Sequence, residues 1–192
     1  MEAVVEMSPK TMNTQRALGI EWDPSSDILC FRFHIPEKPL TRRGLLAAVC
    51  SLFDPLGLVA PVCLTAKQLL QELCKAGLGW DSPVSEDHSI RWHSWLNLVK
   101  SIGVVRYPRC LSPDDFVGVC NPELHVFSDA SETGYGVAAY ARFVSNDGRV
   151  VCRLIFGNSR VAPLKTVTVP GLELAAAALA AGVYKLLIDS LP

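Results

Sequence analysis

The sequence has 192 residues, enough for one large domain or two small ones. Hydrophobic residues make up 49% of it, which is sufficient to bury a core, and the formal net charge is only -1. Proteins that hold a nucleic-acid backbone by overall charge are usually more basic. Any nucleic-acid role must therefore depend on local patches or on neighbouring domains.

Seven cysteines are present and none forms a Cys-x-x-Cys pair, so we expect buried free thiols rather than a zinc site. The first residues are acidic and do not form a signal peptide. The longest apolar stretch, residues 174–183, is shorter than the roughly 20 residues that span a bilayer. We expect an intracellular protein, in the cytoplasm or the nucleus, with no membrane partner.

The first half of the sequence predicts a hairpin followed by helices. Residues 1–16 show no periodicity and are expected to be a flexible lead. The turn sequence Asp23-Pro24-Ser25-Ser26-Asp27 separates two short apolar stretches, which predicts a β-hairpin of residues 18–22 and 28–33.

Three helices are expected after this hairpin, at residues 41–53, 62–75 and 86–101. Thr41 is a suitable N-cap for the first, and the sequence Asp54-Pro55-Leu56-Gly57 ends it. In the second and third helices, apolar residues recur at helical spacing, which predicts one apolar face on each. The residues that we assign to the core are Ala66, Leu69, Leu70, Leu73, Trp92, Trp95, Leu96 and Val99. The single histidines His34, His88 and His93 are expected to be surface or helix-face residues rather than metal ligands or catalytic bases.

Residues 103–122 contain three prolines and are interpreted as a connection between two domains, residues 17–102 and 123–192. In the second domain the sequence predicts three antiparallel strands, at residues 123–129, 135–143 and 150–156. A helix from Pro170 to about Asp189 follows them. The fold class is therefore mixed α/β, of the α+β kind.

Two acidic residues are prominent because of where they lie. Asp129 ends the first of these strands, and Glu173 is in the first turn of the alanine-rich helix, where the helix dipole favours a carboxylate. Strand alternation places His125, Phe127 and Asp129 on one face. If the helix packs on the sheet, the two carboxylates could share a divalent cation. The alternative is that Asp129 forms a turn and Glu173 only complements the dipole.

Several strings of the sequence, in this order, resemble the Pol polyprotein of BEL/Pao-type LTR retrotransposons over about residues 17–190. They are Leu18-Gly19-Ile20-Glu21-Trp22-Asp23, Thr41-Arg42-Arg43, Phe53-Asp54-Pro55-Leu56-Gly57-Leu58-Val59-Ala60-Pro61, Trp80-Asp81, Leu124-His125-Val126-Phe127-Ser128-Asp129-Ala130-Ser131, Ser159-Arg160-Val161-Ala162-Pro163 and Val169-Pro170-Gly171-Leu172-Glu173-Leu174.

The resemblance implies that residues 17–34 are the last hairpin of a reverse-transcriptase palm and residues 41–102 a thumb-like connection. Residues 123–190 would be the N-terminal half of a ribonuclease H (RNase H)-like domain. Asp129 and Glu173 would then be catalytic metal ligands for Mg²⁺ or Mn²⁺, and the parent reaction would be cleavage of RNA in RNA–DNA hybrids. The implied partners are such a hybrid, or another nucleic acid, and the rest of the polyprotein.

The sequence departs from the family pattern. The third and fourth carboxylates of the family would follow the helix, and the polymerase aspartates would precede residue 1. Asp189 lies 16 residues beyond Glu173 (189 − 173), about 24 Å along a continuous helix, so it is rejected as a substitute. Glu132 is nearer to Asp129 but lies in a turn. Gly171 and Asn158 stand where the family often has basic residues.

We therefore expect a truncated Pol fragment, inactive alone, which binds Mg²⁺ or Mn²⁺ by resemblance or no ion at all. Two alternatives stay open: a non-catalytic nucleic-acid-binding or interaction module, and a ribonuclease H completed by another chain. Candidate contacts to a nucleic-acid backbone are the basic residues Arg149, Arg153, Arg160 and Lys165, which could equally form a solvated face.

Hydrolase chemistry of two other kinds is excluded. An aspartic protease needs an Asp-Thr-Gly or Asp-Ser-Gly loop, and the sequence has neither. A serine triad of His125, Ser128 and Asp129 fails on geometry, because Ser128 faces away from the other two on a strand.

Overall fold

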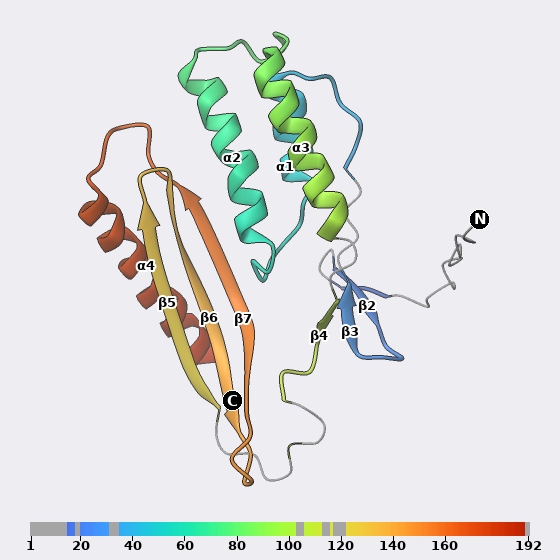
Figure 1. Ribbon diagram of the computed structural model, residues 1–192, viewed down its shortest axis with the longest axis vertical. Coiled ribbons are helices and arrows are strands. Elements are labelled where there is room, and N and C mark those ends of the chain that lie inside the picture. The colour runs from blue at the N-terminus through green and yellow to red at the C-terminus, as the bar shows by residue number, and fades with distance from the viewer. Residues whose placement is uncertain are drawn as a thin grey trace, which may run out of the picture.

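The computed structural model describes residues 15–17, 20–30, 35–102, 106–112, 116 and 122–190. These residues form two antiparallel sheets and four helices, so the predicted α+β class is confirmed. A group of three helices lies beside the larger strands, and a fourth helix covers the opposite side of those strands (Figure 1).

The smaller sheet contains β1 (Gln15–Ala17), β2 (Ile20–Asp23), β3 (Ile28–Cys30) and β4 (Arg106–Pro108), in that order. The predicted hairpin is confirmed as the β2–β3 pair, in which Trp22 lies opposite Leu29. The predicted strand residues 31–33 lie outside the described residues.

Strands β1 and β4 were not expected, because they lie in the segments predicted to be a flexible lead and a connection between domains. Each has only three residues, too few to show a periodicity. β1 pairs with β2 and β4 pairs with β3. Such pairing depends on neighbouring strands and cannot be predicted from a local sequence pattern.

The three helices of the first half agree closely with prediction. Helix α1 (Arg42–Cys50) is capped by Thr41, whose Oγ1 accepts the Gly44 N–H at 3.2 Å. It ends three residues earlier than expected. Helices α2 (Ala60–Lys75) and α3 (Glu86–Ile102) have the expected buried faces. The Trp92 and Trp95 rings stack with their centroids 4.6 Å apart and are 4% and 3% exposed, which confirms them as core.

The larger sheet consists of β5 (Glu123–Ser131), β6 (Gly134–Val144) and β7 (Val150–Val161), with β6 in the centre. Strand β7 runs five residues further than predicted. Helix α4 (Val169–Ser190) packs over β5 and β6. Its Val183 joins a core with Val137 and Ala139 of β6.

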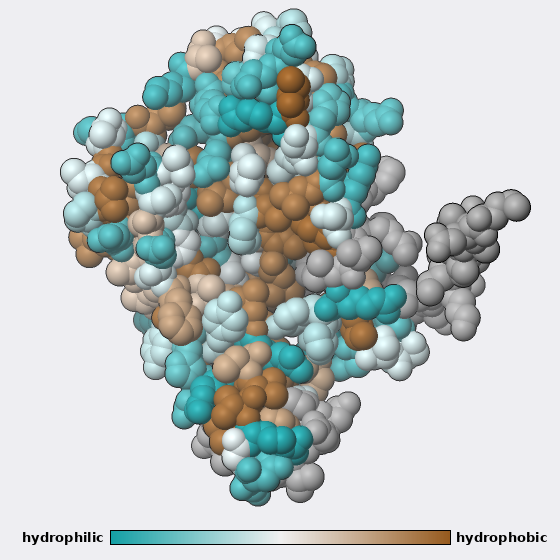
Figure 2. All heavy atoms as spheres, viewed as in Figure 1, coloured by the Kyte–Doolittle hydropathy of each residue, from teal (hydrophilic) through white to brown (hydrophobic). Residues whose placement is uncertain are grey.

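The loop between α1 and α2 connects these helices to β7 through hydrogen bonds and close backbone packing. The Gly157 N–H donates to the Leu56 carbonyl at 2.8 Å, and the Ser159 hydroxyl donates to the Ala60 carbonyl at 2.8 Å. Gly57 has φ +67°, and a Cβ built there would lie 1.6 Å from the Gly157 oxygen. Hydrophobic residues gather in the middle of this side of the molecule, where the helices meet the sheets (Figure 2).

Asp54 holds the same loop in shape. Its carboxylate accepts the backbone N–H groups of Leu58 and Val59 at 3.0 and 2.9 Å. Partial burial raises the pKa of this carboxyl, and these N–H donors oppose the rise. The Phe-Asp-Pro-Leu-Gly string noted in the sequence is therefore a docking loop, with the aspartate as its internal anchor.

Two sequence-based expectations were wrong. Six cysteines in the described residues are free, as predicted, but only Cys63 is buried, and Cys50, Cys74, Cys110 and Cys152 are exposed. Helix α4 has 22 residues and contains an 18-residue window with a mean hydropathy of 1.6, so by length and composition alone it could cross a membrane. The estimate from residues 174–183 counted too short a stretch. One such helix is weak support for a membrane span, because core helices also meet this criterion.

We predict that Gly57→Ala lowers the free energy of unfolding by roughly 2–4 kcal/mol, because it combines a left-handed φ with a backbone collision. Urea unfolding measures the loss. The matched control is Gly77→Ala, since Gly77 has φ +68° but nothing within 4 Å of a built Cβ. It should cost about 1 kcal/mol. Equal losses in the two variants would contradict the docking role of Gly57.

Candidate functional site

Asp129 lies near the end of β5 with its side chain exposed. Its Oδ1 accepts the Ala130 N–H at 2.8 Å. It borders a cleft of about 470 Å³ between the β5–β6 face and the start of α2, which supplies Pro61 and Leu64. Asp129 is the single charged residue among the described residues that line this cleft, which is otherwise largely apolar.

The alternation predicted for β5 is reflected in its packing. Leu124 and Val126 belong to the core that contains Val183 of α4. Phe127 is 60% exposed and meets Tyr140 edge to face, with ring centroids 6.0 Å apart, on the cleft side. Because Asp129 alternates with Phe127, its carboxylate belongs to the cleft face and α4 packs on the opposite face.

Glu173 is exposed, but α4 begins at Val169 and has no acidic residue in its first turn, so the expected first-turn position of Glu173 was wrong. The turn begins at Thr168, whose Oγ1 accepts the Gly171 N–H at 3.3 Å. The neighbouring Leu172 and Thr133 of the β5–β6 turn border one hollow. Glu173 is therefore at the same end of the sheet as Asp129, although it comes from the element on the other face.

The described residues do not fit a two-metal centre. They contain no group of three or more His, Cys, Asp or Glu side chains placed to hold a metal ion. Asp129 and Glu173 contribute two exposed carboxylates from elements on opposite faces of the sheet. Mg²⁺ sites in proteins also use few carboxylates, but a two-metal nuclease needs ligands that bridge and flank both ions.

The two weaker acidic candidates differ in their distance from this pair. Helix α4 is continuous to Ser190, so Asp189 is about 24 Å along the axis from Glu173, as the sequence predicted. Glu132 is exposed in the turn after β5 and borders the hollow beside Leu172.

The basic residues do not form one patch. Arg149 precedes β7 and Arg160 is near its other end, about 35 Å away along the strand. Arg149 pairs with Asp147 at 2.8 Å, and Arg153 is in the middle of β7. Arg160 and Lys165 are exposed and lie towards the Asp129 end of the sheet.

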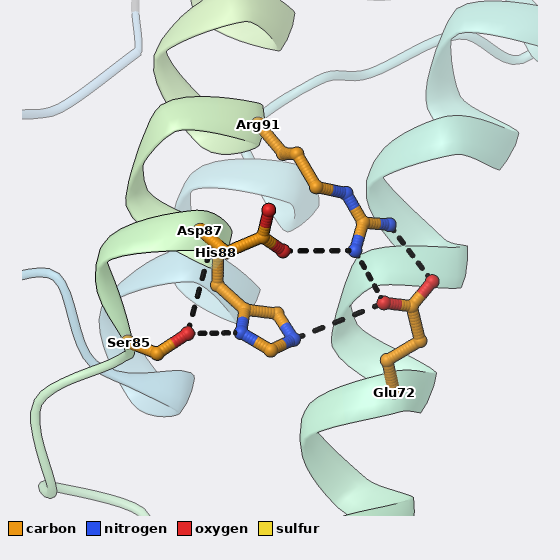
Figure 3. Close-up of polar contacts among 5 residues, drawn as sticks. All are labelled: Glu72, Ser85, Asp87, His88 and Arg91. Atoms are coloured by element: carbon orange, nitrogen blue, oxygen red, sulfur yellow. Dashed lines mark hydrogen bonds and ion pairs between the residues drawn. The ribbon is translucent and has the colours of Figure 1, made fainter.

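A polar cluster that sequence reasoning missed joins α2 to α3 (Figure 3). The Ser85 hydroxyl lies 2.6 Å from His88 Nδ1, and His88 Nε2 lies 3.8 Å from Glu72. The order hydroxyl, imidazole, carboxylate is that of a catalytic triad.

The cluster nevertheless has a structural role. Ser85 Oγ also accepts the His88 N–H at 3.4 Å, as a helix cap does. Arg91 donates two hydrogen bonds to Glu72, at 2.6 and 2.8 Å, so this carboxylate is engaged in an ion pair. The cluster ties the two helices together. From the sequence, only the contact within α3 could have been predicted, because Asp87 and Arg91 are four residues apart on one helix.

Comparison with known proteins identifies the class and then the family. Three antiparallel strands followed by a long helix on one face are consistent with an α+β fragment of the RNase H-like kind. The family model described as "Pao retrotransposon-like RNaseH-like domain" matches residues 41–192, and the chain belongs to this family. A comparison with curated proteins gave no match. The family match begins at the first helix and therefore includes the docking loop as well as the sheet.

We predict a pH-dependent contribution from the Glu72–Arg91 pair. Hydrogen bonds from Arg91 lower the pKa of Glu72 below its ordinary 4.5. The stabilisation is therefore fully present above about pH 4.5 and is lost as the pH falls through the lowered value. Glu72→Gln should cost roughly 0.5 kcal/mol at pH 7 and less at pH 3, measured by urea unfolding. Asp87→Asn, at 3.7 Å from Arg91, is the control with a smaller effect. The same loss for Glu72→Gln at both pH values would refute the ion pair.

Proposed function

We propose that the chain is part of a retrotransposon Pol polyprotein whose parent activity is metal-dependent cleavage of RNA in RNA–DNA hybrids. In this proposal residues 17–34 are the end of a reverse-transcriptase palm, and residues 41–102 are the thumb-like connection. Residues 123–190 are the RNase H-like part. Residues 1–192 alone bind a hybrid weakly and do not cleave it.

The family match carries the first half of this proposal. The position of the two sequence-predicted acids is consistent with it, since Asp129 and Glu173 are at one end of the sheet and both are exposed. The hairpin formed by β2 and β3 is consistent with a palm end, because β4 and the helices follow it without an intervening domain.

In this proposal the lack of cleavage follows from the incomplete set of metal ligands. The described residues supply two exposed carboxylates and no third ligand beside them. Within the described part of the chain, neither carboxylate has an ion-pair partner that would fix its orientation. The carboxylates of Asp129 and Glu173 can attract a cation or a hydrogen-bond donor, but they do not fix two metal ions in place. The missing ligands would come from elsewhere in the polyprotein or from another chain.

The alternative of a non-catalytic nucleic-acid-binding module is favoured by one observation. Arg160 of β7 lies across β6 from Ala130, the neighbour of Asp129 on β5. Tyr135 of β6 pairs with Ala130 on one side and with Arg160 on the other. Together with Lys165 in the following loop, Arg160 gives this end of the sheet two exposed cations. Such cations can position phosphates without reading sequence.

We predict the outcome of a gel assay with a labelled RNA–DNA hybrid and Mg²⁺ or Mn²⁺. The chain should shift the hybrid at low salt and leave its RNA strand intact, because the metal ligands are incomplete. Arg160→Ala combined with Lys165→Ala should weaken the shift about tenfold and flatten its salt dependence.

Asp129→Asn and the nearby Glu132→Gln form the control pair for any cleavage that is seen. RNA cleavage that is lost in Asp129→Asn and kept in Glu132→Gln would show that residues 1–192 suffice for activity and would overturn the proposed inactivity. A chain that neither shifts nor cleaves the hybrid would argue against a nucleic-acid role for this region.

A further inference from the structure

Two glutamines of α2 hold the loops at the Asp129 end of the sheet. Gln71 Nε2 donates to the Ala162 carbonyl at 2.5 Å, and Gln68 Nε2 donates to the Thr133 carbonyl at 3.4 Å. The Ala162 N–H also donates to the Thr133 carbonyl, at 3.1 Å, so the two loops are joined to each other as well as to the helix. The pair Gln68 and Gln71, the amide clamp, therefore ties α2 to the turn after Asp129 and to the loop that leads into α4.

The amide clamp forms one wall of a hollow of about 610 Å³. Helix α2 presents one polar face to this hollow, because the lining residues recur at intervals of three and four. They are Gln68, Gln71, Glu72 and Lys75. The other walls are the β5–β6 turn, the loop before α4 and the start of α4. Ligand sites in proteins commonly have volumes of roughly 300–1,000 Å³, and this hollow is within that range.

Lys75 is the single cation among the described lining residues. Within the described part of the chain its exposed ammonium group has no ion-pair partner. Glu72 does not neutralise it, because the Glu72 carboxylate turns towards Arg91 of α3 and accepts two hydrogen bonds there, at 2.6 and 2.8 Å (Figure 3). Glu132 is the other acidic residue of this lining and comes from the opposite wall. Lys165, exposed in the loop before α4, adds a second cation nearby.

Hydroxyl groups complete the polar lining of the hollow. Thr133, Thr166 and Thr168 all border it and are exposed. Hydroxyl, amide and ammonium groups are the side-chain groups that contact phosphate and sugar in protein–nucleic acid interfaces. The lining therefore matches a sugar–phosphate backbone better than it matches base edges.

We propose that this hollow binds a stretch of nucleic-acid backbone, with Lys75 as a direct phosphate contact and the amide clamp as a positioning pair. The inference rests on the proposed hybrid binding and extends it from the sheet to helix α2. The hollow is next to both sequence-predicted acids. Glu132 of the lining follows Asp129 by three residues, and Leu172 of the lining directly precedes Glu173. A strand that passes these acids can therefore continue along α2.

A peptide partner explains the hollow less well. An extended peptide needs backbone groups with which to pair, or an enclosed apolar pocket for an anchor side chain. The wall carbonyls of Thr133 and Ala162 already accept hydrogen bonds from the amide clamp. The apolar lining residues Leu164 and Val167 are 58% and 40% exposed, so they do not form an enclosed pocket.

The phosphate contact is tested by the binding of a labelled RNA–DNA hybrid, measured by fluorescence anisotropy at several salt concentrations. Lys75→Gln should raise the dissociation constant about threefold to tenfold and reduce the salt slope by about one, because one phosphate contact is lost. The matched control is Lys67→Gln. Lys67 is another exposed lysine of α2, but it borders a separate small pocket beside Asp54, so this variant should keep the salt slope of the parent chain.

Gln71→Met separates positioning from contact. Methionine has a similar length but no amide, so the hydrogen bond to the Ala162 carbonyl is lost while no charge changes. The dissociation constant should rise about threefold at the salt slope of the parent chain. Far-ultraviolet circular dichroism checks that each variant is folded. A folded Gln71→Met chain with the parent affinity would overturn the role of the amide clamp.

Lysine acetylation followed by mass spectrometry detects the contact without any substitution. Saturating hybrid should slow the acetylation of Lys75 at least about threefold, because a phosphate covers its ammonium group. The acetylation of Lys67 should be unchanged, since this lysine is outside the hollow.

Three results would overturn the inference. The first is parent-like binding by Lys75→Gln together with no protection of Lys75. If Arg160→Ala combined with Lys165→Ala still weakens the binding in that case, the proposed hybrid binding stands without the α2 site. The second is protection of Lys75 by poly-glutamate and not by the hybrid, which would assign the hollow to an acidic protein. The third is a parent chain that does not bind the hybrid at all, which would overturn the proposed hybrid binding as well.

Discussion

The arrangement of the molecule depends on the close backbone contact between the α1–α2 loop and β7. The Gly157 N–H donates to the Leu56 carbonyl, and the backbones at Gly57 and Gly157 approach so closely that neither position has room for a Cβ. Asp54 holds the loop in this shape through two backbone N–H groups. Because the loop leads directly into α2, the same contact places the first turn of α2 over the sheet and creates the cleft that Asp129 borders.

Because side chains alternate along β5, its core-facing and its cleft-facing residues lie on opposite faces of the sheet. Leu124 and Val126 bind α4 through the core, while Phe127 and Asp129 face the cleft. Asp129 and Glu173 lie at one end of the sheet, and the described residues contain no group of three or more His, Cys, Asp or Glu side chains placed to hold a metal ion.

Helix α4 packs on β5 and β6 with one of its sides. One side of α4 is buried against β5 and β6, and the other exposes Leu174, Tyr184 and Ile188.

The sequence by itself determined the features that adjacent residues encode. Thr41 capped its helix, the apolar spacing of α2 and α3 identified their buried faces, and alternation identified the face of Asp129. The tertiary structure decided that β1 and β4 complete the smaller sheet, that most described cysteines are exposed, and that Glu72, His88 and Arg91 meet across two helices. It also decided that α4 packs on the face opposite Asp129. Periodicity records which side of an element is apolar, whereas the choice of partner for that side depends on packing between segments that are far apart in the chain.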